Sequence, residues 1–359
     1  MAEMTGSPVS VPCMLMRGGT SKGAYFLAED LPADPATRDE LILRIMGSPD
    51  PRQIDGLGGA HPLTSKVAIV SRSTEPGTDL DYLFLQVGVG EPTLGTQQTC
   101  GNLLAGIGPF AVERGLMAAG EGTTTARIRL LNTGDRAVAT FSTPAGAVDY
   151  DGGITLDGVP GRAGGITLEV SSGPDQALLP TGRTVDEIEG VETTLVANGM
   201  PVVLLRAGDL GLTGDEAPND LESRTELRQT LEQIRAAAGR LMGLGEVADQ
   251  SVPKMVLLSA PRHGGTIHTR TFIPHRVHTS IGVLMAASVA AGLRLPGSVG
   301  SELAEIDDDG IDLIEHPTGS LPSQVTVRQD DSGTFHATST SVRTARPLFD
   351  GRVFPRPRL

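Results

Sequence analysis

Short apolar runs, alternating or continuous and separated by glycine-rich segments, predict a chain built mainly of short β-strands. The run at residues 63–70 is rich in β-branched residues, as expected of a central strand. Residues 126–143 alternate on both sides of a turn at 132–135 and predict a hairpin. Further strands are predicted in this half at residues 11–16, 25–26 and 81–89.

Two helices are predicted among these strands. One follows the turn at residues 34–35, and its buried side is predicted to consist of Leu41, Leu43, Ile45 and Met46. The other begins at Thr99 or Cys100, where a helix N-cap is expected, and ends at Gly115. Glycine-rich loops at residues 17–23 and 55–59 interrupt the strands.

The second half of the chain repeats this order of elements. An acidic amphipathic helix is predicted at residues 220–242, and an apolar helix at 278–292. The alternating residues 323–340 correspond in length to the earlier hairpin. Strands are predicted at residues 198–207, 254–260 and 267–273.

This repetition admits two interpretations. Short α+β elements often look alike, so a similar order of elements can arise without related domains. Alternatively, the chain forms two similar domains, residues 1–185 and 186–359, with a C-terminal tail that can return to the first domain. In the second arrangement the N-termini of two glycine-flanked helices point into one cleft, where their dipoles favour a small anionic ligand.

Composition narrows the range of functions. The 359 residues include 46 glycines and 25 prolines but only 3% aromatic residues, which again favours turns and short strands. The net charge is −14, and no basic run interrupts the acidic surface, so a nucleic-acid or membrane-surface role is not expected. The N-terminus lacks the basic and apolar regions of a secretory leader, and residues 281–291 are too short to span a bilayer. We therefore expect a cytoplasmic protein.

The two cysteines are too few for a disulfide framework or a four-thiolate zinc site. Cys13 falls within an apolar strand and is predicted to be a core residue. Cys100 precedes Gly101 and Asn102 at a predicted helix N-terminus, where backbone N–H groups and the helix dipole stabilise a thiolate. The alternative for Cys100 is a small residue packed under a helix cap. The flanking glycine and asparagine favour an acid–base role.

Lys66 interrupts the otherwise apolar run LTSKVAIV. At a strand end that faces a cleft, desolvation lowers the pKa of such an amine and makes it a base. On an edge strand, its ammonium group would instead lie in solvent. The loop RGGTSKG at residues 17–23 offers Arg17, Thr20, Ser21, the Lys22 ammonium and backbone amides to carboxylates, and it can also serve as a tight turn.

No cofactor signature in the sequence is complete. The loop at residues 17–23 lacks the Walker spacing, no GxGxxG fingerprint follows a strand, and no Gly-x-Ser-x-Gly elbow occurs. His275 and His278 have no apparent third partner for a metal ion. The sequence thus predicts chemistry without a nucleotide, nicotinamide, flavin or metal.

Four segments together resemble the PrpF-like family, whose fold is that of diaminopimelate epimerase: MLMRGGTSKGAYF, IDGLGG, LTSKVAIVS and TCGNLLAGIGPFA. The resemblance covers nearly the whole chain. It is strongest to the 4-oxalomesaconate tautomerases or Δ-isomerases of protocatechuate and gallate breakdown, a route that consumes lignin-derived aromatics. It implies an α+β fold of two similar domains, each a sheet or barrel around a central helix, with the active site between them. The helices would begin near Gly101 and near Ser280.

The resemblance also implies which residues act. Diaminopimelate epimerases place one cysteine at each helix end. Cys100 matches the first position, whereas Thr279 or Ser280 stands at the second, which argues against two-thiol epimerisation. Lys66 matches the lysine that PrpF-like isomerases are thought to use with a single thiol. The implied substrate-binding residues are Arg17, Thr20, Ser21, Ser65, Gly101, Asn102, Asn198, Met200, Thr279 and Ser280.

The expected reaction is a cofactor-free 1,3-allylic proton shift in a small tricarboxylate. Lys66 is expected as the base and Cys100 as the acid, and the reverse assignment stays open. Three alternatives remain: the same site acting on aconitate or methylitaconate, an amino-acid epimerase, and a non-catalytic protein that binds a tricarboxylate or a partner enzyme. An acidic two-domain enzyme of this kind is also compatible with a homodimer.

Overall fold

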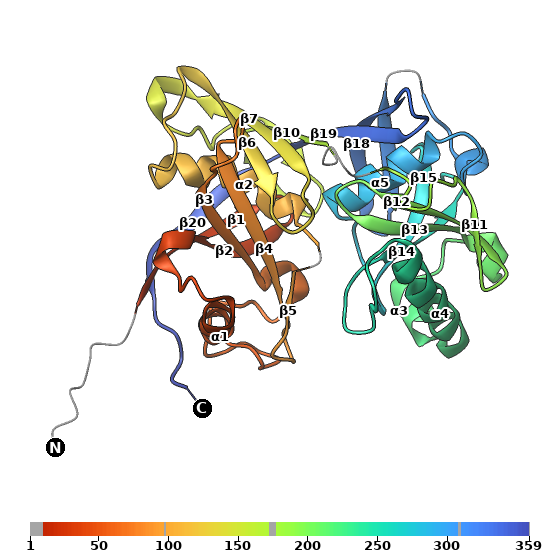
Figure 1. The fold of residues 1–359 in the computed structure, drawn as a ribbon, viewed down its shortest axis with the longest axis horizontal. Helices are drawn as coiled ribbons and strands as arrows, with labels where there is room; N and C mark the ends of the chain where they lie inside the picture. Colours follow the sequence, from red (N-terminus) through yellow and green to blue (C-terminus); the bar gives the residue numbers. More distant parts are fainter. Residues whose placement is uncertain (1–9, 97, 172–176, 308–309, 359) are drawn as a thin grey trace.

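The computed structural model describes residues 10–96, 98–171, 177–307 and 310–358. Residues 1–9, the first part of the segment predicted to lack a leader, lie outside the described residues. In the described part of the chain, eighteen strands form one continuous sheet, which curls into two lobes (Figure 1). No helix in this part is long and apolar enough to cross a membrane.

The first lobe combines the N-terminal strands with the last strand of the chain. Helix α1 (Pro35–Met46) packs on its outside, and the hairpin of β8 (Ile154–Leu156) and β9 (Val159–Ala163) projects from it. The strands of its sheet are β1 (Val11–Gly18), β2 (Ser21–Leu27), β3 (Lys66–Arg72), β4 (Leu80–Val87), β5 (Leu94–Gly95), β6 (Gly122–Leu130), β7 (Arg136–Thr143), β10 (Ile166–Ser171) and β20 (Ala345–Val353).

The second lobe repeats this plan with its own strands. Helices α3 (Pro218–Ser223) and α4 (Thr225–Leu241) lie on its outer side (Figure 1). Its strands are β11 (Asp186–Ile188), β12 (Val191–Ala197), β13 (Pro201–Arg206), β14 (Lys254–Ser259), β15 (Ile267–Ile273), β16 (Arg276–Val277), β17 (Ile311–His316), β18 (Gly319–Gln329) and β19 (Phe335–Arg343).

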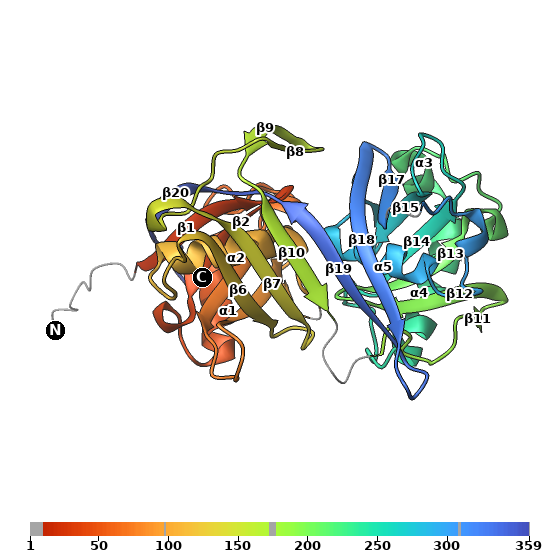
Figure 2. The ribbon, with the colours of Figure 1, turned by 90° about the horizontal axis from the view of Figure 1, so that it is seen from above.

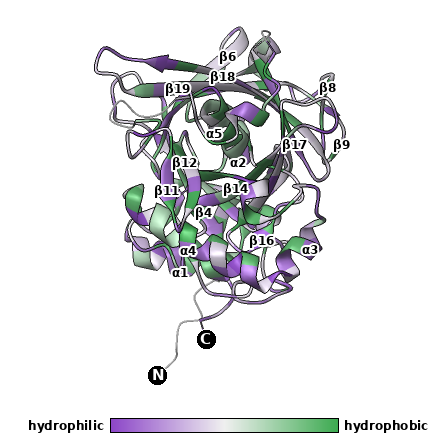
Figure 3. Cartoon of the chain, turned by 90° about the vertical axis from the view of Figure 1, so that its right-hand side faces the viewer, coloured by the Kyte–Doolittle hydropathy of each residue, from purple (hydrophilic) through white to green (hydrophobic). Residues whose placement is uncertain are grey.

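Each lobe wraps its strands around one apolar helix. These helices are α2 (Gly101–Glu113) and α5 (Val283–Leu293), and every residue of α5 is buried. A helix that is apolar on all sides is stable only inside a core, which explains the position of both helices in the middle of the strands (Figure 3). This is the α+β arrangement that the sequence predicts.

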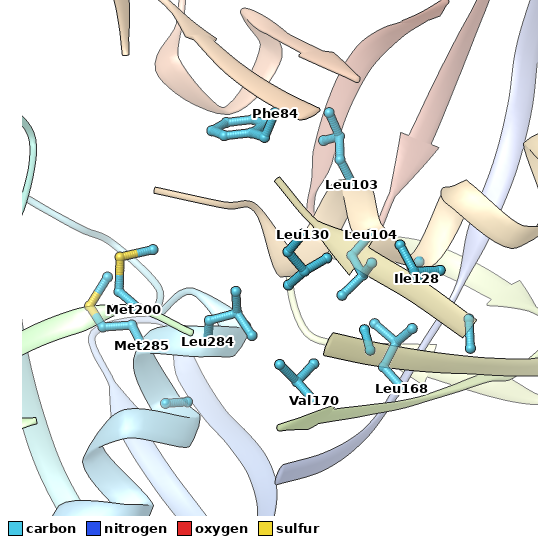
Figure 4. Close-up of a cluster of buried hydrophobic side chains, with 14 of the residues drawn as sticks. Phe84, Leu103, Leu104, Ile128, Leu130, Leu168, Val170, Met200, Leu284 and Met285 are labelled. Atoms are coloured by element: carbon cyan, nitrogen blue, oxygen red, sulfur yellow. The ribbon is translucent and has the colours of Figure 1, made fainter. Parts of the chain in front are cut away.

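Two strands join the lobes. β19 pairs with β18 of the second lobe and with β10 of the first, and β20 then pairs with β1, so the chain ends in the first lobe (Figure 2). One apolar cluster also continues across the boundary. Leu284 of α5 points toward Leu130 and Val170 of the first lobe (Figure 4). The two lobes therefore share a packed interface beside the helix ends.

The structure corrects two local predictions. In α1, Ile42 is buried and Leu43 only partly, because residues spaced i, i+1, i+4 and i+5 from Leu41 face the sheet. The single helix predicted at residues 220–242 is two helices, separated at Arg224, which has extended backbone angles. Glu222 accepts a hydrogen bond from the backbone N–H of Val277, which holds α3 against β16 while α4 packs elsewhere on the lobe.

Candidate active site

A cavity of about 390 Å³ lies where the two lobes meet. Both central helices direct their N-terminal ends at it. Among the described residues that line it, none is acidic, although the chain as a whole carries a charge of −14. The residues that line the cavity include Ser21, Lys66, Phe84, Gln86, Cys100, Gly101, Asn102, Met200, Lys254, Ile273, Arg276, His278, Thr279 and Gly282.

Cys100 is the N-cap residue of α2, as its sequence context predicts. Its side chain makes no capping hydrogen bond, so the cap residue itself does not satisfy the first N–H groups of α2. A Cβ atom on Gly101 would lie 3.0 Å from Cβ of Val283, which shows how closely the N-terminal ends of α2 and α5 approach each other. The half-buried thiol thus lies at a helix end that faces the cavity.

The second central helix does not begin near Ser280, which corrects that prediction. Helix α5 begins at Val283, and Gly282 is its N-cap. The segment before α5 is not helical, and in it the backbone N–H of Ser280 donates to Nδ1 of His278 at 2.9 Å. Gly282, rather than Thr279 or Ser280, therefore stands where Cys100 stands in the first lobe. Thr279 lines the cavity and Ser280 does not.

Lys66 is the first residue of β3 and is only 8% exposed. Its Nζ donates to Oε1 of Gln86 at 2.6 Å and lies 5.1 Å from the centre of the Phe84 ring. Burial lowers the pKa of Lys66 below its ordinary value of 10.5, and a thiolate at Cys100 acts in the opposite direction. This environment favours the neutral amine more than solvent would.

Gln86 was not among the residues predicted for the site. Its Nε2 donates to the backbone carbonyls of Pro62 and Ser65, both at 3.1 Å, so its oxygen is turned toward Lys66. The two residues are direct partners in the antiparallel register of β3 and β4. In the sequence, the only sign of Gln86 was that it is a polar residue within the apolar strand predicted at residues 81–89. The strand register is needed to place Gln86 opposite Lys66.

The turn between β1 and β2 is tied to the start of α2. Nδ2 of Asn102 donates to Oγ1 of Thr20 at 3.0 Å and to Oγ of Ser21 at 3.3 Å. Asn102 and Ser21 line the cavity, whereas Thr20 does not. Arg17 also lies outside the cavity lining, and its Nη1 donates to Oγ1 of Thr344 at 2.9 Å.

Two further predicted binding residues lie behind the cavity wall. Ser65 is fully buried, and its hydroxyl donates to Oε1 of Gln53 at 2.6 Å. Asn198 is fully buried in the turn between β12 and β13, where its Nδ2 donates to the carbonyl of Ala287 at 3.3 Å. Met200, from the same turn, does line the cavity. The binding roles of these residues stay predictions.

The second lobe contributes titratable groups that the sequence analysis did not assign. Lys254, the first residue of β14, is 2% exposed, and burial lowers its pKa well below 10.5, with the charge of Lys66 acting in the same direction. Burial, together with Lys66 and Lys254, lowers the pKa of His278 to about 4. His278 is therefore a neutral imidazole at pH 7.

The other cysteine lies apart from the cavity, and the two histidines considered as metal ligands are separated. Cys13 is fully buried in the core, as predicted, and burial raises the pKa of its thiol to about 12. Within the described residues, no group of three or more His, Cys, Asp or Glu side chains is arranged to hold a metal ion. His278 lines the cavity, while His275 lies 3.9 Å from Glu232 at the surface.

Two lobes around facing helices make this a protein of the epimerase and racemase fold. A crystal structure of a hydroxyproline epimerase from Agrobacterium vitis matches with a TM-score of 0.58 at 15% identity, covering 96% of this chain and 92% of that one. The chain belongs to the PrpF family, whose model, described as PrpF protein, matches residues 8–356. The family and the fold class predicted from the sequence are thus confirmed.

Relatives within the family are similar over nearly their full length. The chain is 52% identical to the (4E)-oxalomesaconate Delta-isomerase of Novosphingobium sp. strain KA1, covering 96% of this chain and 97% of that protein. A crystal structure of methylitaconate-delta-isomerase matches with a TM-score of 0.77 at 31% identity, covering 98% of this chain and 96% of that one.

Proposed function

We propose that this protein is an isomerase that moves a carbon–carbon double bond in 4-oxalomesaconate by a 1,3-proton shift. The observation that carries this proposal is the presence of a buried amine, Lys66, and a thiol at the N-cap position of α2, Cys100, in one cavity whose described lining contains no acidic residue. The 52% identical relative is named for this reaction and is covered over 97% of its length, which supports the choice of substrate.

The two groups are sufficient for the proton transfers. The neutral amine of Lys66 takes a proton from a carbon beside the carbonyl, and the resulting negative charge spreads over a dienolate. The thiol of Cys100 gives a proton to the carbon two positions away, which completes the shift of the double bond. Transfer of a proton from the Lys66 ammonium to the thiolate, through solvent, restores both groups. The N-terminal end of α2 stabilises the dienolate while it exists.

The lining of the cavity supports an anionic substrate. Oxalomesaconate carries several carboxylates, and the described wall contains lysine, arginine and helix N-termini but no acidic side chain. A second candidate substrate is methylitaconate, because the matching crystal structure with a TM-score of 0.77 is that of a methylitaconate isomerase. Identity is lower to that protein, 31% against 52%, so we place oxalomesaconate first.

The test is proton NMR in D₂O with 4-oxalomesaconate, aconitate and methylitaconate offered separately to the purified protein. We expect rapid migration of the double bond with 4-oxalomesaconate, accompanied by deuterium at the allylic position. Migration with methylitaconate alone would select the second candidate. If none of the three exchanges a proton, the protein is not an isomerase of this class, and a non-catalytic tricarboxylate-binding role takes its place.

Substitutions at Gln86 test which protonation state of Lys66 is active. If neutral Lys66 is the base, kcat rises with pH as this amine loses its proton. Gln86→Glu places a carboxylate against the amine and is expected to raise its pKa, moving this rise to higher pH by about one to three units. The pH profile of kcat measures the shift.

Gln86→Leu serves as the matched control, since it removes the hydrogen bond without adding charge. It should lower kcat without the upward displacement. Equal profiles for Gln86→Glu and the wild type would contradict a role for neutral Lys66 in the rate-limiting step.

A further inference from the structure

The cavity contains a second lysine that the proposed reaction does not use. Lys254 begins β14 as Lys66 begins β3, with the sequences KMVLLS and KVAIVS. In each lobe this strand runs parallel to the one before it, with Lys66 opposite Gly23 and Lys254 opposite Val202. Each lysine precedes the central helix of its own lobe. Lys254 is therefore the second-lobe counterpart of Lys66.

Lysine is rare in this protein. The sequence contains only three lysines, Lys22, Lys66 and Lys254, against 26 arginines. Lys66 and Lys254 are buried and line the same cavity, whereas Lys22 does not line it. Unlike arginine, lysine can lose its proton when buried and regain it beside an anion. The cavity thus holds two of the chain's three lysines.

The two lysines differ in their partners. Lys66 has the amide oxygen of Gln86 opposite it in the register of β3 and β4. In the second lobe Met255 lies opposite Phe272, and continuing that register places Ile273 opposite Lys254. Ile273 offers no acceptor. Throughout the described part of the chain, no acceptor or carboxylate is in contact with Nζ of Lys254.

The charges nearest to Lys254 are positive. The charges of Lys66 and Arg235 both lower the pKa of Lys254. Arg235 itself donates hydrogen bonds to Glu232 and to backbone carbonyls of the loop that precedes β14. A buried ammonium without a counter-ion is costly, so an anion that enters the cavity stabilises the protonated form of Lys254.

The first turn of α5 faces the same space. Its N-cap, Gly282, has no side chain to cap the helix, and the helical ladder begins only with the N–H of Ala286 donating to the carbonyl of Gly282. The N–H groups of residues 283–285 therefore have no helical acceptor, and these residues line the cavity. Free N–H groups at a helix N-terminus favour a carboxylate.

We propose that Lys254 and the first turn of α5 form a subsite that binds a carboxylate group of the substrate. This inference rests on the proposed function, in that the substrate is a polycarboxylate. It assigns different tasks to the two lobes. The first lobe transfers protons through Lys66 and Cys100. The second lobe, with Gly282 in place of a thiol, holds the substrate.

The first test observes the amine directly. In protein labelled with ¹³C at the lysine ε-carbons, the three lysines give three signals, which Lys22→Met and Lys66→Met variants assign. The probe is propane-1,2,3-tricarboxylate, a saturated compound that cannot isomerise. We expect the Lys254 signal to move from the neutral-amine to the ammonium position when the probe binds, while the Lys22 signal stays unchanged. No binding of the probe, or binding without any change at Lys254, would overturn the subsite.

The second test uses Lys254→Met, with Lys22→Met as the matched control. We expect the variant to lose at least about 30-fold in affinity for the probe and to raise KM by a similar factor, with kcat little changed. Its thermal midpoint should be no lower than that of the wild type, because an unpaired buried amine is removed. A loss of kcat at unchanged KM would make Lys254 an acid–base group instead and reject the subsite.

These tests separate the subsite from the proposed reaction. If the wild type isomerises none of the offered substrates, the reaction is wrong, and the probe still reports on Lys254. If the wild type isomerises oxalomesaconate while Lys254→Met keeps its affinity for the probe, the reaction stands and the subsite is rejected. Should Lys254→Met fail to fold, the wild-type NMR titration decides alone.

Discussion

Lys66→Met is expected to lower kcat for double-bond migration by about 10²- to 10⁴-fold while leaving the fold intact. Methionine fills nearly the same space beside Phe84 but cannot accept a proton, so only the acid–base function is removed. Initial rates and the circular dichroism spectrum measure activity and fold together. Lys22→Met, outside the cavity lining, is the control for loss of a lysine. Full activity of Lys66→Met would remove this residue from the mechanism.

The same variant has a signature in stability. The pKa of folded Lys66 is lowered below 10.5, so at intermediate pH the unfolded chain binds a proton that the folded amine does not. The free energy of unfolding therefore rises with pH between the folded pKa and 10.5. In Lys66→Met this contribution disappears, and denaturant titrations at several pH values should show a smaller slope. Lys254 produces a similar slope, which persists in this variant.

Local signals explain which parts of this structure could be predicted from the sequence. The apolar stretches that become α2 and α5 have no polar face, so only a central position in a core suits them. Cys100 was recognisable because an N-cap is defined by the few residues around it. Lys66 was recognisable because a charged residue within an apolar strand requires a special environment.

Features that depend on distant contacts could not be predicted in this way. The sequence predicts that Arg17 binds a carboxylate, but its guanidinium donates to Thr344, which is distant in the sequence. Ser65 is adjacent to Lys66, yet its hydroxyl donates to Gln53, and neither Ser65 nor Gln53 lines the cavity. Alternation along a strand separates neighbouring side chains, and only the register reveals which face is the site.

The position of Lys254 shows a different limit. Its strand was predicted to begin at residue 254, but the interval from this lysine to the N-cap Gly282 is shorter than the interval from Lys66 to Cys100. Loops of different length between equivalent elements hide the correspondence in the sequence. In the structure, each lysine begins a strand that pairs in parallel with the strand before it, so the two positions can be seen to correspond.

Cys100→Ser is expected to lower kcat by about 10²- to 10⁴-fold, since a serine hydroxyl is a far weaker acid than a thiol and cannot supply a proton to the dienolate. The substitution preserves size, and the thiol makes no capping hydrogen bond that could be lost. A loss below about tenfold would make Cys100 a structural residue at the start of α2.

Deuterium exchange then determines which group takes the first proton. If Lys66 removes it, Cys100→Ser in D₂O should still exchange the acidic C–H of the substrate, although the double bond no longer moves. Lys66→Met should show neither exchange nor migration. If the thiolate of Cys100 is the base instead, the results for the two variants should be reversed. Deuterium should then enter the substrate only in Lys66→Met. The pair of variants therefore assigns acid and base from one NMR measurement, because each blocks a different half of the proton shift.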